Sequence, residues 1–237
     1  MQIKLLNYFM KNKIALITGG TGFIGTYLAK KLLLKGWKVN IIDLKKSKDT
    51  IINQKCKFYK LDLKKISPKH KCFKNISTIF HLAAFPSISR LNKKKFLENN
   101  LGGTKKIILC AKKNNISSIV YSSSSTVYGI PNKFPLNEED AGNTIGFYGK
   151  SKWLGEKELL SSASSKLTIS ILRPRVVIGP GRLGIFHIFF KRILNNKNIY
   201  LIGNGSNYFQ FTNVNDFVDA LIKASNAKKT LILNIGS

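Results

Sequence analysis

The sequence predicts an α/β fold in which helices cover both faces of a doubly wound parallel sheet. Strand-like and helix-like segments alternate through the first two thirds of the 237 residues, as a chain of βαβ units requires. A short apolar run at residues 14–17 (IALI) turns through glycines into a helical pattern. A content of 43% hydrophobic residues is enough to bury a substantial core between such layers.

Each element of this fold has a local signal. Apolar runs bounded by turn residues predict strands at residues 13–18, 38–43, 57–61, 77–82, 117–123, 167–173, 199–202 and 231–235. Helical periodicity predicts helices at residues 23–35, 91–114, 143–164, 184–196 and 214–226. We expect an N-terminal extension at 1–12, a sheet domain at 13–175, and a small, truncated substrate lobe at 176–237 mixed with elements that return to the sheet.

The glycine-rich turn at residues 18–25 (TGGTGFIG) predicts a Rossmann-type dinucleotide site. Gly19 can take backbone angles that are closed to other residues, and Gly22 leaves room for a pyrophosphate. Gly25 lets the helix pack closely on the strand. The N–H groups and positive dipole end of that helix, which begins at Phe23 and Ile24, then face the phosphates.

Asp43 predicts which dinucleotide binds. It ends the second strand, 18 residues after Gly25, where a carboxylate that binds the ribose is expected. We therefore expect NAD rather than NADP. Two alternatives stay open: Asp43 alone could be a solvated carboxylate at a strand end, and a preference for NADPH would mean that Lys45 and Lys46 dominate the local field.

The formal net charge of +29 raises the question of a nucleic-acid or anionic membrane partner. Lysine supplies almost all of the excess and is spread along the chain beside abundant Ile and Asn. Arginine is the better fork for phosphates and base edges. We therefore expect a small-molecule substrate and no specific nucleic-acid partner.

Cysteine, histidine and hydropathy patterns limit the function further. Cys56, Cys72 and Cys110 have no metal-ligand spacing, and the histidines are scattered, so we expect reduced thiols and no metal site. No apolar run is long enough to span a bilayer. The first residues lack the apolar core and cleavage site of a secretory signal, and we expect a cytoplasmic protein.

Hydroxyl groups and a Tyr/Lys pair indicate hydride-transfer chemistry. The serines at 122–125 follow a predicted strand, at the edge where open α/β sheets collect ligands. Tyr148 and Lys152 lie one helical turn apart on one face. A nearby ammonium and a cationic nicotinamide would favour the phenolate of Tyr148. A serine would then hold the substrate oxygen while Tyr148 moves its proton and the cofactor moves the hydride. Alone, the pair is typical of a solvated helix face; with the glycine turn and Asp43 it predicts a catalytic site.

Together these residues resemble the extended short-chain dehydrogenase/reductases, also called NAD-dependent epimerase/dehydratases, over residues 13–237. The resemblance rests on the glycine turn, the serine run and further motifs at residues 62–63 (DL), 81–84 (HLAA), 100–104 (NLGGT), 148–152 (YGKSK), 173–174 (RP) and 179–181 (GPG). It implies Asp62 and Leu63 near the adenine, Ala83 and Ala84 along the cofactor, and Ser124, Tyr148 and Lys152 as the catalytic set. We also expect Tyr148 and Lys152 to bind the cofactor. By the same resemblance, Asn100 supports the site from a helix, and His81 packs or orients the loop rather than titrating.

The serine run favours one reaction of that family. Its 4,6-dehydratases carry an acidic residue two places before the motif that stands here at 127–129 (VYG), and its nucleotide-sugar decarboxylases carry a glutamate there. This chain has Ser125 and Thr126 instead, so both reactions lose their acid. Residues 122–129 look most like the C4 epimerases of UDP-sugars, which oxidise the hydroxyl, let the 4-keto sugar turn over and return the hydride to its other face.

The second half departs from the epimerase pattern. Phe209 stands where those enzymes have a diphosphate-binding arginine, and losing a charged fork costs several hydrogen bonds. Arg173-Pro174 followed by the 179–181 motif is also similar to 3β-hydroxysteroid dehydrogenases. Arg175 or Arg182 could restore phosphate binding, or either could be a surface cation.

Three functions therefore stay open. The favoured one is a nucleotide-sugar epimerase, UDP-hexose-like, that works by transient hydride transfer. The second is an NAD(P)-dependent dehydrogenase or reductase of a non-nucleotide alcohol or ketone. The third is a non-catalytic NAD-binding protein. The family resemblance also allows a homodimer.

Overall fold

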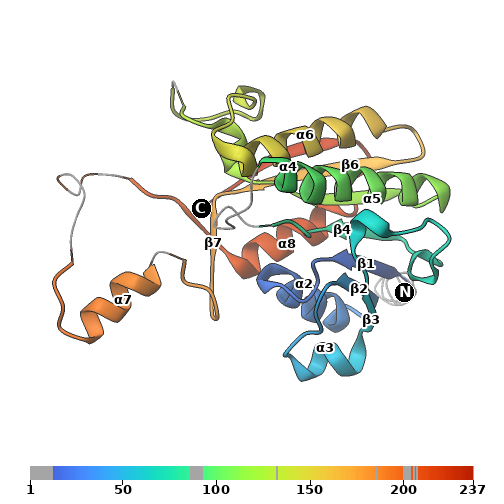
Figure 1. Ribbon diagram of the computed structural model, residues 1–237, viewed down its shortest axis with the longest axis horizontal. Coiled ribbons are helices and arrows are strands. Elements are labelled where there is room, and N and C mark those ends of the chain that lie inside the picture. Colours follow the sequence, from blue (N-terminus) through green and yellow to red (C-terminus); the bar gives the residue numbers. More distant parts are fainter. Residues whose placement is uncertain are drawn as a thin grey trace, which may run out of the picture.

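A seven-stranded parallel sheet forms the centre of the fold in the computed structural model, which describes residues 13–85, 93–131, 133–184, 186–199, 204, 206 and 208–236 (Figure 1). The strand order is β3-β2-β1-β4-β5-β6-β9. The strands are β1 (Ile14–Thr18), β2 (Lys38–Asp43), β3 (Lys57–Lys60), β4 (Thr78–His81), β5 (Ser118–Ser122), β6 (Thr168–Pro174) and β9 (Leu231–Ile235). This order is that of a Rossmann sheet with one further strand at its edge.

Helices cover both faces of the sheet and confirm the doubly wound prediction (Figure 1). One face carries α2 (Phe23–Leu34) and α8 (Val214–Ala224), which pack against each other, with the short α3 (Thr50–Lys55) beside α2. The other face carries α5 (Gly102–Lys113) and α6 (Gly146–Ser162), preceded by α4 (Lys93–Phe96).

The alternation of side chains along β1 explains the two layers. Leu16 lies in a buried cluster with Ile107 and Leu159 on one face, whereas Ile17 lies with Leu28 on the other. Successive side chains of a strand point to opposite faces, so one apolar run supplies both cores. Burying each such side chain stabilises the fold by about 1.5–3 kcal/mol.

The structure departs from the sequence prediction in short elements. The sequence missed α3, whose N-cap Asp49 accepts a hydrogen bond from Ile52 N, and it missed two strands of three residues. The helix expected at 91–114 is α4, a π-helical turn at Leu97–Leu101, and α5. Elements this short carry too few residues for a period to show. The extension expected at 1–12 and residues 200–202 of the strand expected at 199–202 lie outside the described residues.

A lobe projects from the carboxyl edge of the sheet (Figure 1). It begins at β7 (Val176–Ile178), which pairs in parallel with β8 (Phe211–Asn213), and it carries α7 (Phe186–Leu194). Every residue of α7 keeps some exposure, and Leu194 is 84% exposed. After β8 the chain returns to the sheet domain, where α8 packs on α2 and β9 pairs with β6.

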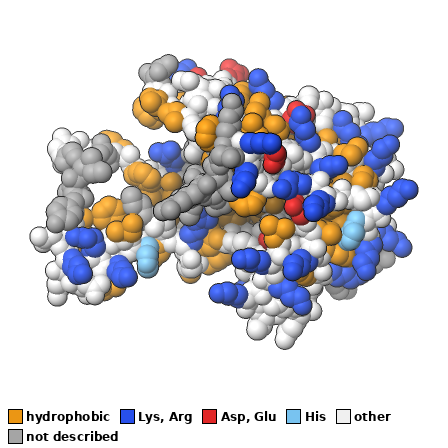
Figure 2. All heavy atoms as spheres, viewed as in Figure 1, with side chains coloured by type: hydrophobic (Ala, Val, Ile, Leu, Met, Phe, Trp, Pro, Cys, Tyr) orange, Lys and Arg blue, Asp and Glu red, His pale blue; other side chains and the backbone are white. Residues whose placement is uncertain are grey.

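The structure also shows how the charged side chains and the cysteines are distributed. Lysine and arginine side chains are scattered over the face shown in Figure 2. The three cysteines are free and buried, and burial raises the pKa of Cys72 to about 12. Within the described residues, no helix is long and apolar enough to cross a membrane, and no three His, Cys, Asp or Glu side chains form a possible metal site.

Candidate active site

The glycine turn lies at the point where the strand order reverses. Strands β2 and β3 follow on one side of β1, and β4 to β6 follow on the other, so the carboxyl ends of β1 and β4 form the switch point at which open α/β sheets bind their ligands. Gly19 has φ +71°, and a Cβ there would lie 2.8 Å from the backbone N and Cα of Ala83. Ala83 N also donates to Thr18 Oγ1 at 3.3 Å. The loop after β4 therefore closes directly on the turn.

The start of α2 offers the features that a dinucleotide phosphate requires. A Cβ on Gly25 would lie 2.3 Å from the carbonyl oxygen of Gly19, so only glycine allows this close approach. Gly22 is the exposed N-cap; it supplies no capping side chain, and the first turn carries no acidic residue. The first N–H groups of a helix lack intrahelical acceptors and attract anions. The residues at Phe23 and Ile24 therefore fit a pyrophosphate.

Asp43 is held beside this turn. Its Oδ2 accepts a hydrogen bond from Thr21 N at 3.1 Å, and its Oδ1 accepts one from Leu44 N at 2.7 Å. Two backbone donors fix the half-buried carboxylate at the end of β2, at the position expected for a ribose-binding group.

Asp62 and Leu63 lie at the end of the next strand. The Asp62 carboxylate caps a 3₁₀ turn at Leu63–Lys65 by accepting from Lys64 N at 2.9 Å. Leu63 packs beside Gly103 at the start of α5. Ala84 is half-buried in the loop after β4. These positions surround the carboxyl edge, and their contact with a cofactor stays a prediction.

Ser124, Tyr148 and Lys152 come together as the sequence predicts. Ser124 follows β5 and caps a 3₁₀ turn at Ser125–Tyr128, accepting from Thr126 N at 3.2 Å and from Thr126 Oγ1 at 3.0 Å. Because Thr126 is the donor in both bonds, the Ser124 proton is available for the hydrogen bond to Tyr148. Lys152 lies one turn further along α6.

The Lys152 ammonium is buried beneath this surface. Its Nζ donates to the Ser122 carbonyl oxygen at 2.7 Å and lies 4.6 Å from the centre of the Tyr121 ring. The side chain is only 2% exposed, and burial lowers the pKa of Lys152 to about 7, against the opposing pull of the Glu156 carboxylate. The ammonium can therefore lose its proton near neutral pH.

Two opposing effects set the ionisation of Tyr148. Burial raises the pKa of this half-buried phenol above its ordinary value, whereas the charge of Arg182 and the hydrogen bond from Ser124 lower it. Burial outweighs the other two effects, so Tyr148 is a neutral phenol at pH 7.

His81 takes a structural role, as the resemblance implied. Its Nδ1 lies 2.6 Å from Thr18 Oγ1 and its Nε2 lies 3.0 Å from Thr104 Oγ1. The Thr104 hydroxyl donates to the Asn100 carbonyl, so it accepts from Nε2–H of His81. Burial lowers the pKa of His81 to about 3, which keeps the ring neutral.

Asn100 links the loop after β4 to the catalytic helix. Its Oδ1 accepts from Phe85 N at 2.8 Å, and its Nδ2 donates to Ser151 Oγ at 3.0 Å. Ser151 Oγ in turn donates to the Tyr148 carbonyl oxygen at 2.8 Å. Asn100 is buried within the π-helical turn, a feature often found at functional sites.

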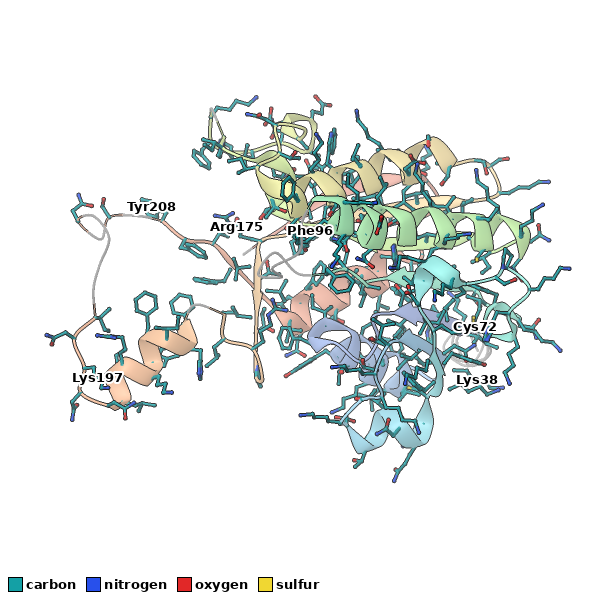
Figure 3. The ribbon with its side chains drawn as sticks, viewed as in Figure 1. Lys38, Cys72, Phe96, Arg175, Lys197 and Tyr208 are labelled. Atoms are coloured by element: carbon teal, nitrogen blue, oxygen red, sulfur yellow. The ribbon has the colours of Figure 1, made fainter. Side chains whose placement is uncertain are left out.

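Arg175 and Arg182, the two arginines expected to contact substrate, have different neighbours. Arg175, where the lobe leaves the sheet domain (Figure 3), is exposed and lies with its Nη1 3.5 Å from Ser125 Oγ. Its guanidinium also lies 5.4 Å from the ring of Phe209. The guanidinium of Arg182 lies 5.9 Å from the ring of Phe23 at the start of α2. Substrate binding by either arginine stays a prediction.

Sequence reasoning missed one buried group of this site. Arg173 and Glu156 form a buried ion pair, and Glu156 also contacts Ser123, the neighbour of Ser124. The sequence showed Arg173 only as part of a family motif and Glu156 only as a helical residue. The available signal was that Glu156 lies four residues after Lys152, on the same helix face.

Gly149 sets how closely α6 approaches the serine turn, and its replacement gives a first prediction. A Cβ there would lie 2.6 Å from the Thr126 carbonyl oxygen, a backbone atom that cannot rotate away. We expect Gly149→Ala to lower the free energy of unfolding by about 1–3 kcal/mol and to reduce turnover, because α6 must move away from Ser124. Urea unfolding and initial rates measure both effects.

Gly102→Ala is the matched control. A Cβ at Gly102 would meet its nearest atom, the Leu97 carbonyl oxygen, at an ordinary 3.8 Å. Alanine is the better helix former by about 1 kcal/mol, so this variant should be as stable as the parent or more so. Equal behaviour of the two variants would show that the close approach at Gly149 has no such role.

Known proteins resemble this chain over most of its length. The profile of the NAD dependent epimerase/dehydratase family matches residues 15–236. An uncharacterized protein y4nG of Sinorhizobium fredii is 34% identical over 95% of this chain and 56% of its own length. A putative UDP-glucose 4-epimerase of Methanocaldococcus jannaschii is 32% identical over 94% of this chain and 76% of its own length. The sterol-4-alpha-carboxylate 3-dehydrogenase, decarboxylating, of Bos taurus is 29% identical over 91% of this chain and 61% of its own length.

Solved structures show the same fold. A UDP-glucose 4-epimerase of Thermotoga maritima with UDP-glucose superposes with a TM-score of 0.84 at 27% identity, covering 94% of this chain and 77% of that one. MoeE5 in complex with UDP-glucose and NAD superposes with a TM-score of 0.81 at 30% identity, covering 94% of this chain and 76% of MoeE5. The chain thus spans between about half and three quarters of the length of these proteins. The family profile covers nearly the whole sequence, and the chain belongs to the NAD dependent epimerase/dehydratase family.

Proposed function

We propose that this protein is an NAD-dependent enzyme that epimerises a nucleotide sugar, UDP-hexose-like, at C4 through transient hydride transfer. One observation carries the proposal: Ser124 is hydrogen-bonded to Tyr148, one turn from the buried Lys152, at the edge of the sheet that holds the glycine turn. In this proposal Tyr148 is the acid/base, Ser124 is the hydroxyl that holds the substrate oxygen, and Lys152 is the cation.

The residues divide the chemistry as follows. NAD held along the glycine turn supplies the acceptor and donor of hydride. Beside a cationic nicotinamide the Tyr148 phenol would lose its proton to solvent, and the resulting phenolate would take the proton of the C4 hydroxyl as that carbon is oxidised. The phenol so formed would return the proton when the sugar is reduced on its other face. Ser124 Oγ–H holds the same substrate oxygen. The ammonium of Lys152 stabilises the phenolate form of Tyr148.

The cofactor site supports NAD. The uncapped N–H groups at Phe23 and Ile24 would donate to the pyrophosphate, and the Asp43 carboxylate would accept hydrogen bonds from the ribose hydroxyls. A carboxylate at this position repels the additional phosphate of NADP. Family members of known structure are complexed with NAD.

Removing the Asp43 carboxylate should change cofactor preference. We expect Asp43→Ser to weaken NADH binding about tenfold or more, because charge-assisted bonds to the ribose are lost. NADPH binding should improve relative to NADH, since exposed Lys45 and Lys46 follow directly. Fluorescence titration with both cofactors measures the ratio. Asp49→Ser, which removes a carboxylate paired with Lys30 and keeps an N-cap residue on α3, is the control, and an unchanged ratio in Asp43→Ser would exclude this role.

Residues in and near the 3₁₀ turn at Ser125–Tyr128 support the proposed substrate. Ser125 and Thr126 replace the acid that dehydration requires, which leaves the oxidised sugar to be reduced again. By the resemblance, Phe209 replaces an arginine that binds the diphosphate in the epimerases. The Arg175 guanidinium lies over the Phe209 ring, so this chain has a cation beside the replaced position. A guanidinium is suited to a diphosphate.

Stoichiometry tests the proposed reaction. The protein, a catalytic amount of NAD and UDP-glucose should yield the C4 epimer, followed by NMR, without net accumulation of NADH. Absence of an epimer from UDP-hexoses, together with stoichiometric oxidation of NADH by a ketone, would overturn the epimerase proposal and favour a dehydrogenase.

A second candidate function is a dehydrogenase of an apolar alcohol. The rings of Phe186 and Phe211 lie 4.7 Å apart and those of Phe209 and Phe211 lie 4.8 Å apart, which gives the lobe an aromatic cluster. Such a cluster suits an apolar substrate body. A cytoplasmic location and a homodimer stay predictions, and light scattering of the purified protein tests the second.

A further inference from the structure

A buried ion pair lies beneath the catalytic residues. Arg173 Nη2 donates to Glu156 Oε2 at 2.6 Å, and its Nε donates to Oε1 at 3.0 Å. Both side chains are at most 2% exposed. Arg173 Nη1 also donates to Tyr128 OH at 2.9 Å. The guanidinium is thus fixed by a bidentate bond and a third contact, so the carboxylate has one orientation.

The carboxylate also holds the strand end that carries the site. Ser123 Oγ donates to Glu156 Oε1. Ser123 lies between Ser122, whose carbonyl oxygen accepts from Lys152 Nζ, and Ser124, which is hydrogen-bonded to Tyr148. Three adjacent serines therefore have three different contacts, and the middle one joins the end of β5 to α6.

Glu156 also faces Lys152 directly. The two residues lie four positions apart on one face of α6. The other titratable groups that face the ammonium are Tyr121 on β5 and neutral His81 on β4. Tyr148 lies one turn away on α6, and Arg173 on β6 is paired with Glu156. Within the described part of the chain, Glu156 is the carboxylate that raises the pKa of Lys152.

We propose that Glu156, clamped by Arg173 and bonded to Ser123, is a positioning residue that holds the Lys152 ammonium and the Ser122–Ser124 strand end in register with Tyr148. The inference rests on the proposed function for its kinetic consequence only. Stability alone does not account for the pair, because a buried ion pair is often no better than well-packed apolar side chains of similar volume.

Ser123→Ala tests the proposal without disturbing the ion pair. We expect kcat for C4 epimerisation to fall about tenfold with KM within about twofold, because small displacements of catalytic groups lower the rate more than binding. Ser170→Ala is the matched control: this buried serine of β6 donates to the Ala224 carbonyl oxygen, away from the site, and its loss should leave kcat unchanged.

A second readout does not depend on the substrate. The side-chain NMR signal of Lys152, assigned by its loss in Lys152→Met, should move in Ser123→Ala and stay in place in Ser170→Ala. In Glu156→Gln its titration midpoint should fall by about one pH unit, since a nearby opposite charge is removed.

The outcomes separate the two proposals. If the parent protein fails to epimerise UDP-hexoses, the proposed function is wrong, and the lysine signal still decides the inference. If Glu156→Gln does not fold, Ser123→Ala decides it. An unmoved Lys152 signal in Ser123→Ala, or a kcat equal to that of Ser170→Ala in an active enzyme, would overturn the positioning role.

Discussion

Tyr148→Phe is expected to lower kcat by about a thousandfold and to leave NADH affinity unchanged. The substitution removes the one phenolic oxygen that Ser124 contacts and keeps the ring that fills the site. General acid/base catalysis by a positioned side chain contributes about 10²–10⁴-fold, so most of the rate should be lost. Initial rates with UDP-hexose and a fluorescence titration with NADH measure the two quantities.

Tyr59→Phe is the control for this substitution. Tyr59 lies on β3, where its ring packs edge-on against His70 at 5.5 Å, and it contacts none of the catalytic residues. Its variant should turn over at the parent rate. Turnover of Tyr148→Phe at a comparable rate would remove Tyr148 from the mechanism and leave cofactor binding as the remaining function.

Lys152→Met should abolish most turnover and stabilise the fold. The pKa of Lys152 is lowered to about 7, so its charged form is disfavoured in the folded chain. Methionine occupies similar volume without the charge. Because burial makes the charged form of Lys152 unfavourable in the folded chain, we expect the free energy of unfolding of Lys152→Met to be higher than that of the parent at neutral pH.

The lowered pKa of Lys152 also predicts how the free energy of unfolding changes with pH. Between about pH 7 and the ordinary lysine value of 10.5, the unfolded chain binds a proton that the folded chain has released. Stability of the parent should therefore rise with pH across this window, and the rise should be smaller in Lys152→Met. Urea unfolding at pH 7 and pH 9 measures it. Lys150→Met, on the exposed face of α6, should keep the parent's slope, and an equal slope in both variants would contradict the buried charge.

The fold and the cofactor turn could be predicted from local patterns. Buried parallel strands appear as apolar runs, and the glycines at 19 and 25 are needed because backbone atoms lie within 2.8 Å of the place that a Cβ would occupy. The spacing of Tyr148 and Lys152 places them on one face wherever that helix packs. Elements of three to six residues, such as α3, β7 and β8, could not be predicted because tertiary pairing rather than local preference forms them.

The sequence by itself determined the sheet, the dinucleotide turn and the residue types of the catalytic set, because each depends on neighbours within a few positions. Only the tertiary structure decided what each polar group does. Ser122, Ser123 and Ser124 are identical in the sequence and differ in their partners. Glu156 meets Arg173 because α6 packs across the end of β6, and the ionisation of Lys152 depends on burial. Desolvation and long-range pairing depend on packed elements, and the spacing of residues along the chain does not record them.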